Sequence, residues 1–444
     1  MNLDQRLENV TVIGAAGKMG SGIAALLAQE MARLRNLPEN KDMIYRLNLL
    51  DVSDKALAGL HSYLKTQLLK NAEKAVVALR GLYKDRADLV ENEEIVRAFV
   101  DDSLSVLRFS TDLVQAKNSR MIFEAIVEDE DVKIKVLKEI NGMCAKDTPY
   151  FTNTSSVPIG FLDDKVGLGG RIIGYHFYNP PVVQRLVEVI TPKSATQDIK
   201  DLAAELGKRL RKTLVPANDK AGFIGNGHFM RDGLHGIDAV NQLKKEHSFA
   251  GAVYIINRVT QDFLIRPMGI FQLIDYVGVD VSQCILRVMS KHLSDKSLHS
   301  DLVDQMAGKK VLGGQNPDGT QKDGFLKYEK NRPAGVYDVE KGTYVSMDEL
   351  KQKLDSKIGD PPIGFAPWKK MAGDPKKEQS LAGYFAGLKN AKGFGADLAR
   401  TYLKRTREIA LQLVTDGIAN SDHDVNSILI NGFYWLYGPI NNYI

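Results

Sequence analysis

The sequence predicts an α/β protein: an N-terminal Rossmann-like, doubly wound sheet followed by an all-α C-terminal region with two related helical units. Two observations favour this class. Short apolar runs alternate with helical segments through the first half, which is typical of a mostly parallel sheet. The first of these runs continues directly into a glycine-rich turn at 14–20. We expect three domains, at 1–216, 217–335 and 336–444.

The composition excludes several classes of protein. The 59 basic and 55 acidic residues are interspersed and leave a net charge of +4, so we expect no nucleic-acid partner. No apolar run approaches the roughly 20 residues that a membrane span needs. The first fourteen residues resemble neither a signal peptide nor a transit peptide, and Cys144 and Cys284 suit a reducing compartment. We therefore expect a cytoplasmic protein.

The glycine turn predicts a dinucleotide site. Residues 10–14 read as a buried strand, Gly14, Gly17 and Gly20 as the turn, and the following residues as a helix. In this context backbone N–H groups approach a pyrophosphate at the positive end of the helix. The spacing is one residue longer between the first two glycines than in the commonest NAD pattern. The alternative is a glycine turn that binds no ligand.

Asp51 is the candidate ligand for the adenosine ribose. It ends the next apolar run, 46–51, where an acid accepts hydrogen bonds from the ribose hydroxyls and repels a 2′-phosphate. The sequence therefore favours NAD over NADP. Asp51 follows Gly20 by 31 residues instead of about 20. We assign the excess, within 31–43, to a longer helix end or an inserted loop.

Two further strands are predicted at 121–127 and at 150–153, the second leading to Ser155. The acids at 128–131 are expected in the first turn of a lysine-rich helix, where they are stabilising without any ligand. The segment 194–197 has the pattern of a capping box, which predicts a helix from there to about Lys212.

His176 and Glu188 are the candidate catalytic pair. His176 ends one apolar run and Glu188 lies inside the next, with the breaker at 179–181 between them. A carboxylate in an apolar run should point into the protein, where an imidazole held by it makes a general base. The alternative is a histidine in a strand turn and a half-exposed glutamate. Ser155 and His176 both follow runs that end at the carboxyl edge of the sheet, where ligands bind.

Several segments, in this order, resemble the L-3-hydroxyacyl-CoA dehydrogenase family of fatty-acid β-oxidation. They are KMGSGIA at 18–24, FEAIVEDEDVKIK at 123–135, TNTSS at 152–156, YHFYNP at 175–180 with RLVEVI at 185–190, and DKAGFIGN at 219–226.

The resemblance implies NAD-dependent oxidation of an acyl-CoA substrate and gives roles to single residues. It makes His176 the catalytic base and Glu188 its orienting carboxylate, with Ser155 and Asn226 holding the 3-oxygen of the substrate. On the cofactor side it places the glycine turn with Lys18 and Met19, and also Glu128, Lys133 and Asn179. Lys74 would meet the CoA phosphates, although Lys65, Lys70 and Lys74 could equally share the solvated face of one helix.

The C-terminal half resembles the same family more loosely. Residues 263–280 are similar to its helical dimerisation and substrate domain, and a partial second copy lies at 416–425 and 433–440. Two such copies resemble the dehydrogenase portion of multifunctional β-oxidation enzymes. This implies a monomer in which one copy packs on the other, with a homodimer as the alternative, and association with other β-oxidation enzymes. We interpret 329–395, including 336–395 of the third domain, as an extended connection.

The chain also departs from the family pattern. His228 stands near Asn226 where the family usually has arginine, and the glycine/lysine segment 309–325 is altered, so we assign no cofactor lysine there. Two alternatives stay open: a sugar-acid (gulonate-type) dehydrogenase of the same fold, and a non-catalytic NAD-binding structural protein. The other histidines show no metal-binding spacing, and no metal is expected.

Overall fold

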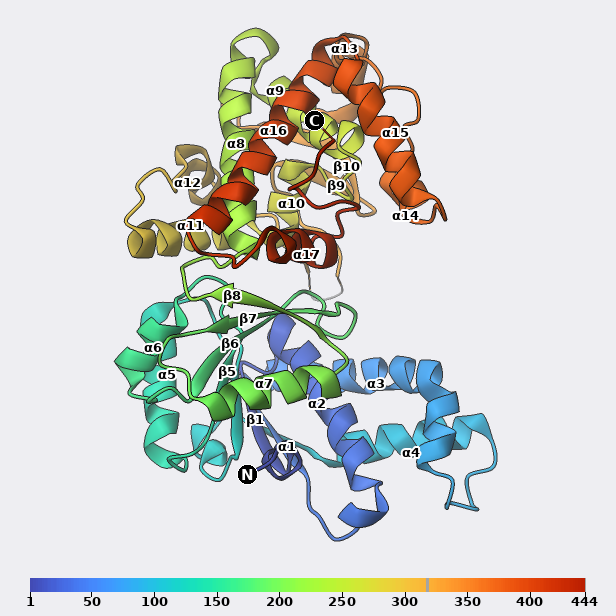
Figure 1. Ribbon diagram of the computed structural model, residues 1–444, viewed down its shortest axis with the longest axis vertical. Coiled ribbons are helices and arrows are strands. Elements are labelled where there is room, and N and C mark those ends of the chain that lie inside the picture. Colours follow the sequence, from blue (N-terminus) through green and yellow to red (C-terminus); the bar gives the residue numbers. More distant parts are fainter. Residues whose placement is uncertain (317–318, 444) are drawn as a thin grey trace. The chain divides into compact units, whose positions relative to one another are not determined.

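The computed structural model describes residues 1–316 and 319–443 (Figure 1). Pro317 and Asp318, which belong to the altered segment 309–325, and Ile444 lie outside the described residues. The chain forms two compact units, Met1–Asp219 and Lys220–Ile444. Both segments that we expected as separate C-terminal domains therefore lie in the second unit, apart from residues 217–219.

The first unit is built on an eight-stranded sheet of order β3-β2-β1-β4-β5-β6-β7-β8. All neighbouring strands are parallel except β6 and β7, which run antiparallel. The strands are β1 (Asn9–Ile13), β2 (Arg46–Leu50), β3 (Leu107–Ser110), β4 (Met121–Glu124), β5 (Tyr150–Thr152), β6 (Ile172–Phe177), β7 (Leu186–Thr191) and β8 (Thr213–Asn218). The predicted doubly wound sheet is confirmed.

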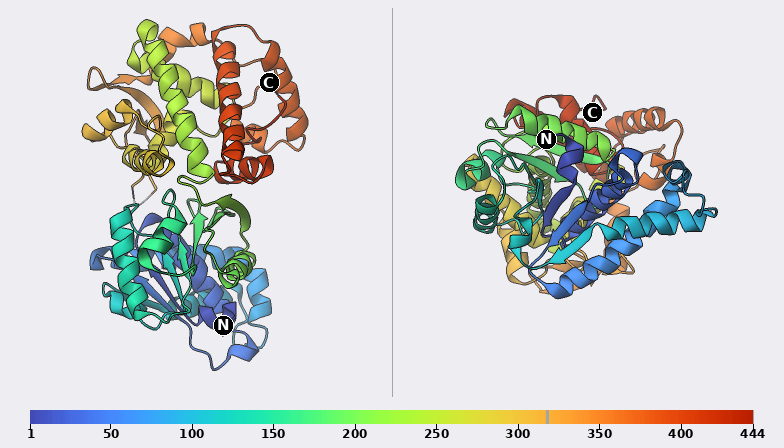
Figure 2. Two further views of the ribbon diagram at one scale, coloured as in Figure 1. Left: turned by 60° about the vertical axis from the view of Figure 1, so that its left-hand side comes forward. Right: turned by 90° about the horizontal axis from the view of Figure 1, so that it is seen from below.

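Helices cover both faces of this sheet, which is why its strands are apolar runs rather than alternating patterns (Figures 1 and 2). One face shares a continuous hydrophobic core with α1 (Leu3–Leu7), α2 (Lys18–Arg35), α3 (Asp54–Leu82), α4 (Asn92–Ser105) and α7 (Gln197–Arg209). The helices α5 (Glu130–Met143) and α6 (Ile159–Val166) pack side by side on the other face. Short 3-10 turns lie at Pro38–Asn40 and Leu113–Ala116. The excess between Gly20 and Asp51 is thus a long α2, a 3-10 turn and a loop.

The predicted capping box at 194–197 is wrong. The helix α7 begins at Gln197, and its N-cap is Thr196, whose side chain caps no N–H among the described residues. The backbone decides this start, because the N–H of Thr196 donates to the carbonyl of Gly170 at 3.0 Å and fixes the chain direction there. The helix ends at Arg209 instead of about Lys212, because Arg211 takes a left-handed conformation with φ of 55°.

The predicted placement of Glu128 in a first helical turn is also wrong. The strand β4 ends at Glu124, three residues before the expected end, and α5 begins at Glu130. Asp129 is the N-cap, with its carboxylate accepting the N–H of Val132 at 2.9 Å. Glu128 therefore lies before the helix, and its carboxylate binds residues 154–156.

The second unit is helical, as predicted, apart from one small sheet. Its first part contains α8 (Gly225–His247), α9 (Phe249–Arg258), a π-turn (Val259–Phe263), α10 (Ile270–Val277), α11 (Val279–Leu293) and α12 (Asp301–Gly308). Its last helices are α16 (Phe394–Thr415) and α17 (Asp422–Gly432). Within the described part of the chain, no helix is long and apolar enough to cross a membrane.

The segment 329–395 is folded, so the expected extended connection is wrong. It completes an antiparallel sheet of β9 (Leu326–Glu329), β10 (Arg332–Asp338) and β11 (Thr343–Ser346), followed by α13 (Met347–Ile358), α14 (Trp368–Ala372) and α15 (Lys377–Asn390). Buried Asp275 anchors the sheet, because its carboxylate accepts the N–H groups of Phe325 at 2.6 Å and Leu326 at 2.8 Å. Apolar side chains such as Val336 then bury its inner face.

The two C-terminal copies share a local backbone design. Asn257 in α9 accepts a backbone N–H at 3.1 Å, and Asn426 in α17 accepts one at 3.0 Å. Eight positions after each asparagine the chain is left-handed, with φ of 48° at Ile265 and 57° at Tyr434. The first helices of the copies, α8 and α16, lie side by side (Figures 1 and 2).

A buried ion pair joins the two copies. Arg266 of the first copy pairs with Asp232 of α8 at 2.9 Å, and both side chains are nearly inaccessible. Thr406 of α16 bonds to both partners, donating to the Asp232 carboxylate at 2.7 Å and accepting from Arg266 at 3.1 Å. The Arg266 guanidinium also lies 3.9 Å from the centre of the Trp435 ring. Thr406 and Trp435 of the second copy thus complete an ion pair whose two charges, Arg266 and Asp232, both belong to the first copy.

Replacing Asp232 with alanine should destabilise the second unit by about 3–5 kcal/mol, because it leaves the Arg266 charge buried and unpaired. Urea unfolding measured with wild type and Asp232→Ala checks this. Asp238→Ala on the exposed side of the same helix is the control, expected to change stability by less than about 0.5 kcal/mol. Equal unfolding midpoints for the two variants would contradict the structural role given to the pair.

Candidate active site

His176 and Glu188 face each other across the sheet. They occupy opposite positions in the antiparallel register of β6 and β7. The Nδ1 atom of His176 lies 3.1 Å from Oε2 of Glu188. The glutamate side chain is 0% exposed and the histidine side chain 11%. The reading of Glu188 as a half-exposed strand residue is therefore excluded, and the carboxylate points into the protein as expected.

Tyr178 is a third member of this group that the sequence did not indicate. Its hydroxyl donates to the same Oε2 atom of Glu188 at 3.1 Å. Its ring centre lies 4.8 Å from that of His176. Burial, and after it the charge of Glu188, raises the pKa of Tyr178 well above its ordinary value. Tyr178 follows His176 by two positions, a spacing that places two side chains on the same face of a strand. The sequence still does not indicate its role, because Tyr178 stands after the end of β6, where this alternation no longer sets the side-chain direction.

The turn that carries Ser155 is organised by Glu128. One carboxylate oxygen of Glu128 accepts the backbone N–H groups of Ser155 and Ser156, both at 2.8 Å. It also accepts the hydroxyl groups of Thr154 at 2.7 Å and Ser156 at 2.8 Å, and lies 3.2 Å from the hydroxyl of Ser155. Glu128 thus fixes the backbone at 154–156 and with it the place of the Ser155 side chain.

Lys133, expected on the cofactor side, lies behind Glu128. Its ammonium pairs with Glu124 at 2.7 Å and Glu128 at 3.3 Å, and its side chain is 1% exposed. Burial alone would raise the pKa of Glu128. The charge of Lys133 and the hydrogen bonds from the Thr154–Ser156 turn outweigh burial and lower this pKa to about 2. Lys133 therefore keeps Glu128 ionised rather than reaching a ligand itself.

Asn153 brings the Ser155 turn to the edge where His176 lies. Its side-chain oxygen accepts the N–H of Phe177 at 2.8 Å, joining the end of β5 to the end of β6. Glu124 ties β4 to β5 in the same way, because it accepts the hydroxyl of Thr152 at 2.6 Å. Ser155 therefore follows β5 and His176 lies near the end of the neighbouring β6, so both are at one edge of the sheet, as predicted.

The glycine turn leaves room only for glycine at its tightest points. Gly14 has φ of 75°, and a Cβ placed on it would lie 2.5 Å from the carbonyl oxygen of Ala125. A Cβ on Gly20 would collide with the carbonyl of Gly14. Asp51 is joined to this turn, since its carboxylate accepts the N–H of Ala16 at 2.9 Å. The glycine turn thus packs closely on the backbone of Ala125 and on its own carbonyl at Gly14. The longer glycine spacing leaves the strand–turn–helix geometry that a pyrophosphate site needs intact.

The remaining predicted residues are more scattered. Asn179 follows β6 in the loop to β7, Lys18 and Met19 open α2, and Lys74 is exposed on α3 with Lys65 and Lys70. Asn226 is the second residue of α8 and belongs to the second unit. The first unit therefore brings together His176, Glu188 and the Ser155 turn, and holds the glycine turn and Asp51 at the neighbouring strands.

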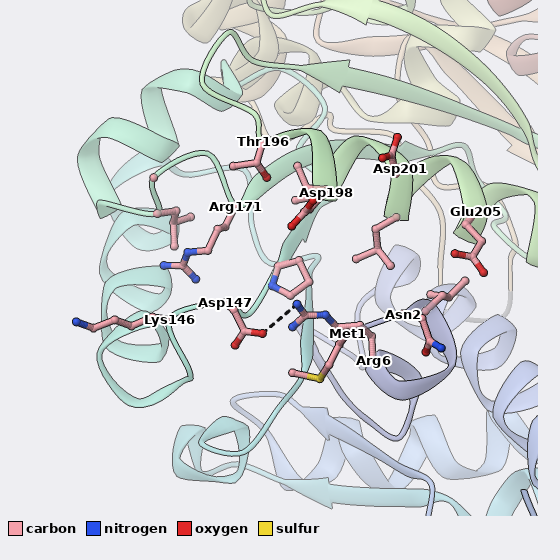
Figure 3. A pocket seen from close by; sticks show the side chains of 16 residues that line it. Met1, Asn2, Arg6, Lys146, Asp147, Arg171, Thr196, Asp198, Asp201 and Glu205 are labelled. Atoms are coloured by element: carbon pink, nitrogen blue, oxygen red, sulfur yellow. Dashed lines mark hydrogen bonds and ion pairs between the residues drawn. The ribbon is translucent and has the colours of Figure 1, made fainter.

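A pocket of about 690 Å³ lies at the other edge of the sheet (Figure 3). Pro149 and Arg171, which precede β5 and β6, line it. Arg6 points toward Asp147 at 3.1 Å, and acidic side chains of α7 such as Asp201 form another wall. Among the described residues that line this pocket, none is a predicted site residue, so its size does not make it the active site.

The depressed pKa of Glu128 predicts an acid-dependent loss of stability. Its contribution, about 3 kcal/mol from the shift between 4.5 and about 2, is present above pH 4.5 and is lost as pH falls toward 2. Denaturant unfolding of wild type and Glu128→Gln from pH 7 to pH 3 checks this. The difference between them should shrink as pH falls. Glu139→Gln, on the exposed side of α5, should show no such trend.

Comparisons with known proteins find matches to both halves of the chain. The model of the 3-hydroxyacyl-CoA dehydrogenase NAD binding domain matches residues 9–220, and the model of the 3-hydroxyacyl-CoA dehydrogenase C-terminal domain matches residues 249–323. The chain is 27% identical to the mitochondrial hydroxyacyl-coenzyme A dehydrogenase of Homo sapiens over 332 residues, which cover 73% of this chain and 92% of that protein.

Two further relatives extend the likeness to the C-terminal half. The chain is 27% identical to the peroxisomal fatty acid beta-oxidation multifunctional protein of Oryza sativa subsp. japonica over 81% of its own length and 43% of that protein. It thus spans less than half of the multifunctional relatives that it matches. The crystal structure of 3-hydroxybutyryl-CoA dehydrogenase from Escherichia coli K12 has the same fold, with a TM-score of 0.65, 21% identity, and coverage of 98% of this chain and 90% of that chain.

The two domain models belong to one family, match in chain order and together cover more than half of the sequence. The chain therefore belongs to the 3-hydroxyacyl-CoA dehydrogenase family, with its NAD-binding domain at residues 9–220.

Proposed function

We propose that this protein catalyses the reversible NAD-dependent oxidation of an L-3-hydroxyacyl-CoA to the 3-ketoacyl-CoA. The observation that carries the proposal is the His176–Glu188 pair, an imidazole held by a fully buried carboxylate at 3.1 Å. The pair lies at the carboxyl edge of a doubly wound sheet, where ligands of this fold bind. The names of the human and rice relatives, hydroxyacyl-coenzyme A dehydrogenase and fatty acid beta-oxidation multifunctional protein, support the substrate class.

His176 acts as the general base. Because Nδ1 faces the carboxylate of Glu188, the proton of the neutral ring stays on Nδ1 and Nε2 is left to accept the hydroxyl proton of the substrate. Glu188 stabilises the imidazolium that forms. When bound, NAD would supply the acceptor for the hydride that leaves C3. In the reverse direction the imidazolium returns the proton to the oxygen of the keto group.

Ser155 provides a hydrogen-bond donor for the substrate oxygen. Its backbone N–H is fixed by Glu128 at 2.8 Å, and its hydroxyl, which donates to the same carboxylate at 3.2 Å, would turn from it to the substrate oxygen. Asn226 is the proposed second donor, a role that the family resemblance implies. Donors of this kind contribute on the order of 10² to 10³-fold to a rate.

The first strands of the sheet would hold the cofactor. The glycine turn and the start of α2, with Lys18 and Met19, would receive the pyrophosphate. Asp51 binds the adenosine ribose, because each of its oxygens accepts one N–H and keeps a second lone pair for a ribose hydroxyl. Its negative charge disfavours the 2′-phosphate of NADP. Glu128 and Asn179 lie on the nicotinamide side, and Lys74 meets the CoA phosphates.

The His176→Ala substitution should reduce turnover by at least about 10² to 10⁴-fold, because it removes the general base. NADH binding should stay close to wild type, because the glycine turn and Asp51 are untouched. Oxidation of NADH with acetoacetyl-CoA, followed at 340 nm, gives the first quantity, and fluorescence titration with NADH gives the second. His423→Ala, an exposed histidine on α17, is the matched control.

The same assay separates the alternatives. Turnover of L-gulonate with no turnover of a 3-hydroxyacyl-CoA would support the sugar-acid dehydrogenase, and tight NADH binding with no turnover of either would support a structural protein. Near-normal activity of His176→Ala would overturn the assignment of the base. Substrates from C4 to C16, with NADH and NADPH in parallel, then define the acyl chain and the cofactor preference.

We also propose that the chain is a monomer. The contacts of Arg266 and Asp232 with Thr406, and of the Tyr402 hydroxyl with the carbonyl of Asp232 at 2.8 Å, occupy the face that joins the two copies. A second subunit would have to displace them. Light scattering should therefore give the mass of one chain, 49.2 kDa, at every concentration tested. A mass near twice this value would favour the homodimer.

A further inference from the structure

We propose that Tyr178 is a positioning residue that sets the basicity of His176 through Glu188, an inference that rests on the proposed function. Three groups meet at one atom: the Tyr178 hydroxyl and Nδ1 of His176 each lie 3.1 Å from Oε2 of Glu188. The two rings are neighbours, with centres 4.8 Å apart. The tyrosine and the histidine therefore share one acceptor oxygen.

Sharing the oxygen weakens the hold of the carboxylate on the imidazole. A buried carboxylate beside a histidine favours the protonated ring and so raises the pKa of the imidazole. A phenol that donates to the same oxygen takes up part of its negative charge, so the imidazolium is stabilised less. Proton abstraction needs the neutral ring, which a less stabilised imidazolium favours.

The tyrosine can act in this way throughout the working pH range. Burial and the charge of Glu188 raise the pKa of Tyr178, so the hydroxyl remains a donor. A phenylalanine in its place would fill almost the same volume and remove only the donor. The role is therefore chemical, and it can be separated from packing.

The other charged groups on the surrounding elements have partners of their own. On the His176 side of β6, the carboxylate of Asp219 binds the N–H groups of Ile159 at 2.6 Å and Gly160 at 2.7 Å, at the start of α6, and Asp163 of that helix binds the N–H of Gly170. Beyond β5, Glu124 and Glu128 are paired with Lys133. On β8, apolar Val215 stands opposite Glu188 in the register.

Lys212, which precedes β8, is a further cation near His176, Tyr178 and Glu188. Its ammonium lies 5.8 Å from the Phe177 ring centre and donates to the carbonyls of Pro181 and Gln184 at 2.5 and 2.6 Å. The helix α7 covers the opposite face of β6, where the Tyr175 hydroxyl donates to the carbonyl of Ala203 at 3.2 Å. Each of these charges is held by a neighbour that the Tyr178→Phe substitution leaves in place.

The test is the titration of His176 itself. In protein labelled with ¹³C-histidine and free of substrate, the His176 signal is assigned from its loss in His176→Ala. Tyr178→Phe should raise the measured pKa of His176 by about 0.5 unit, and Tyr175→Phe, the matched loss of a buried hydroxyl from the strand that carries His176, should leave it unchanged. The acidic limb of kcat/KM for hydroxyacyl-CoA oxidation should move upward with it, a loss of about threefold below the limb.

A double substitution separates this role from a general disturbance. Because the hydroxyl acts through the carboxylate, Tyr178→Phe should have no further effect on the pKa of His176 in a Glu188→Gln background. The inference is overturned if Tyr178→Phe leaves the pKa of His176 where it was, or if Tyr175→Phe moves it equally. The titration needs no turnover, so an inactive wild-type enzyme would reject the proposed function while the titration still decided the role of Tyr178.

Discussion

The buried ammonium of Lys133 is the constraint on which the catalytic edge of the sheet depends. Two carboxylates, Glu124 and Glu128, lie within 3.3 Å of it, and burying a carboxylate is costly without such a partner. Glu124 joins β4 to β5 through Thr152, and Glu128 binds the N–H and hydroxyl groups of residues 154–156. One charge on α5 thereby sets the position of a serine that lies on a different loop.

The His176–Glu188 pair on β6 and β7 is built in the same way, around a buried carboxylate. A carboxylate is placed in an apolar strand and then supplied with donors, His176 from the facing strand and Tyr178 from the loop. Burial strengthens each of these interactions, because little water competes for the oxygen. The site is thus assembled from buried acids whose charges are satisfied by the groups that they position.

The strands β1, β2 and β4 to β7, the glycine turn, Asp51 and the His176–Glu188 pair could be predicted from sequence, since each rests on a local pattern of apolar runs and breakers. The strands β3 and β8 were not predicted. The role of Lys133 could not, because lysine at that position fits an exposed helix face equally well and only the tertiary packing buries it. Tyr178 escaped prediction for a similar reason, standing beyond the end of its strand. The start of α7 was misplaced because a backbone bond to Gly170 overrides the local capping pattern. The folded segment 329–395 was missed because its anchor, Asp275, lies some fifty residues earlier in the chain.

The joined helical copies have a consequence for how this protein can change. In a symmetric dimer every substitution at the interface occurs twice and must tolerate its own image. Here Asp232, Arg266 and Thr406 occur once each, and α8 presents residues to α16 that α16 need not present in return. The two copies are released from self-complementarity. One copy can retain the surface that contacts the substrate, while the other copy needs only to keep its packing against the first.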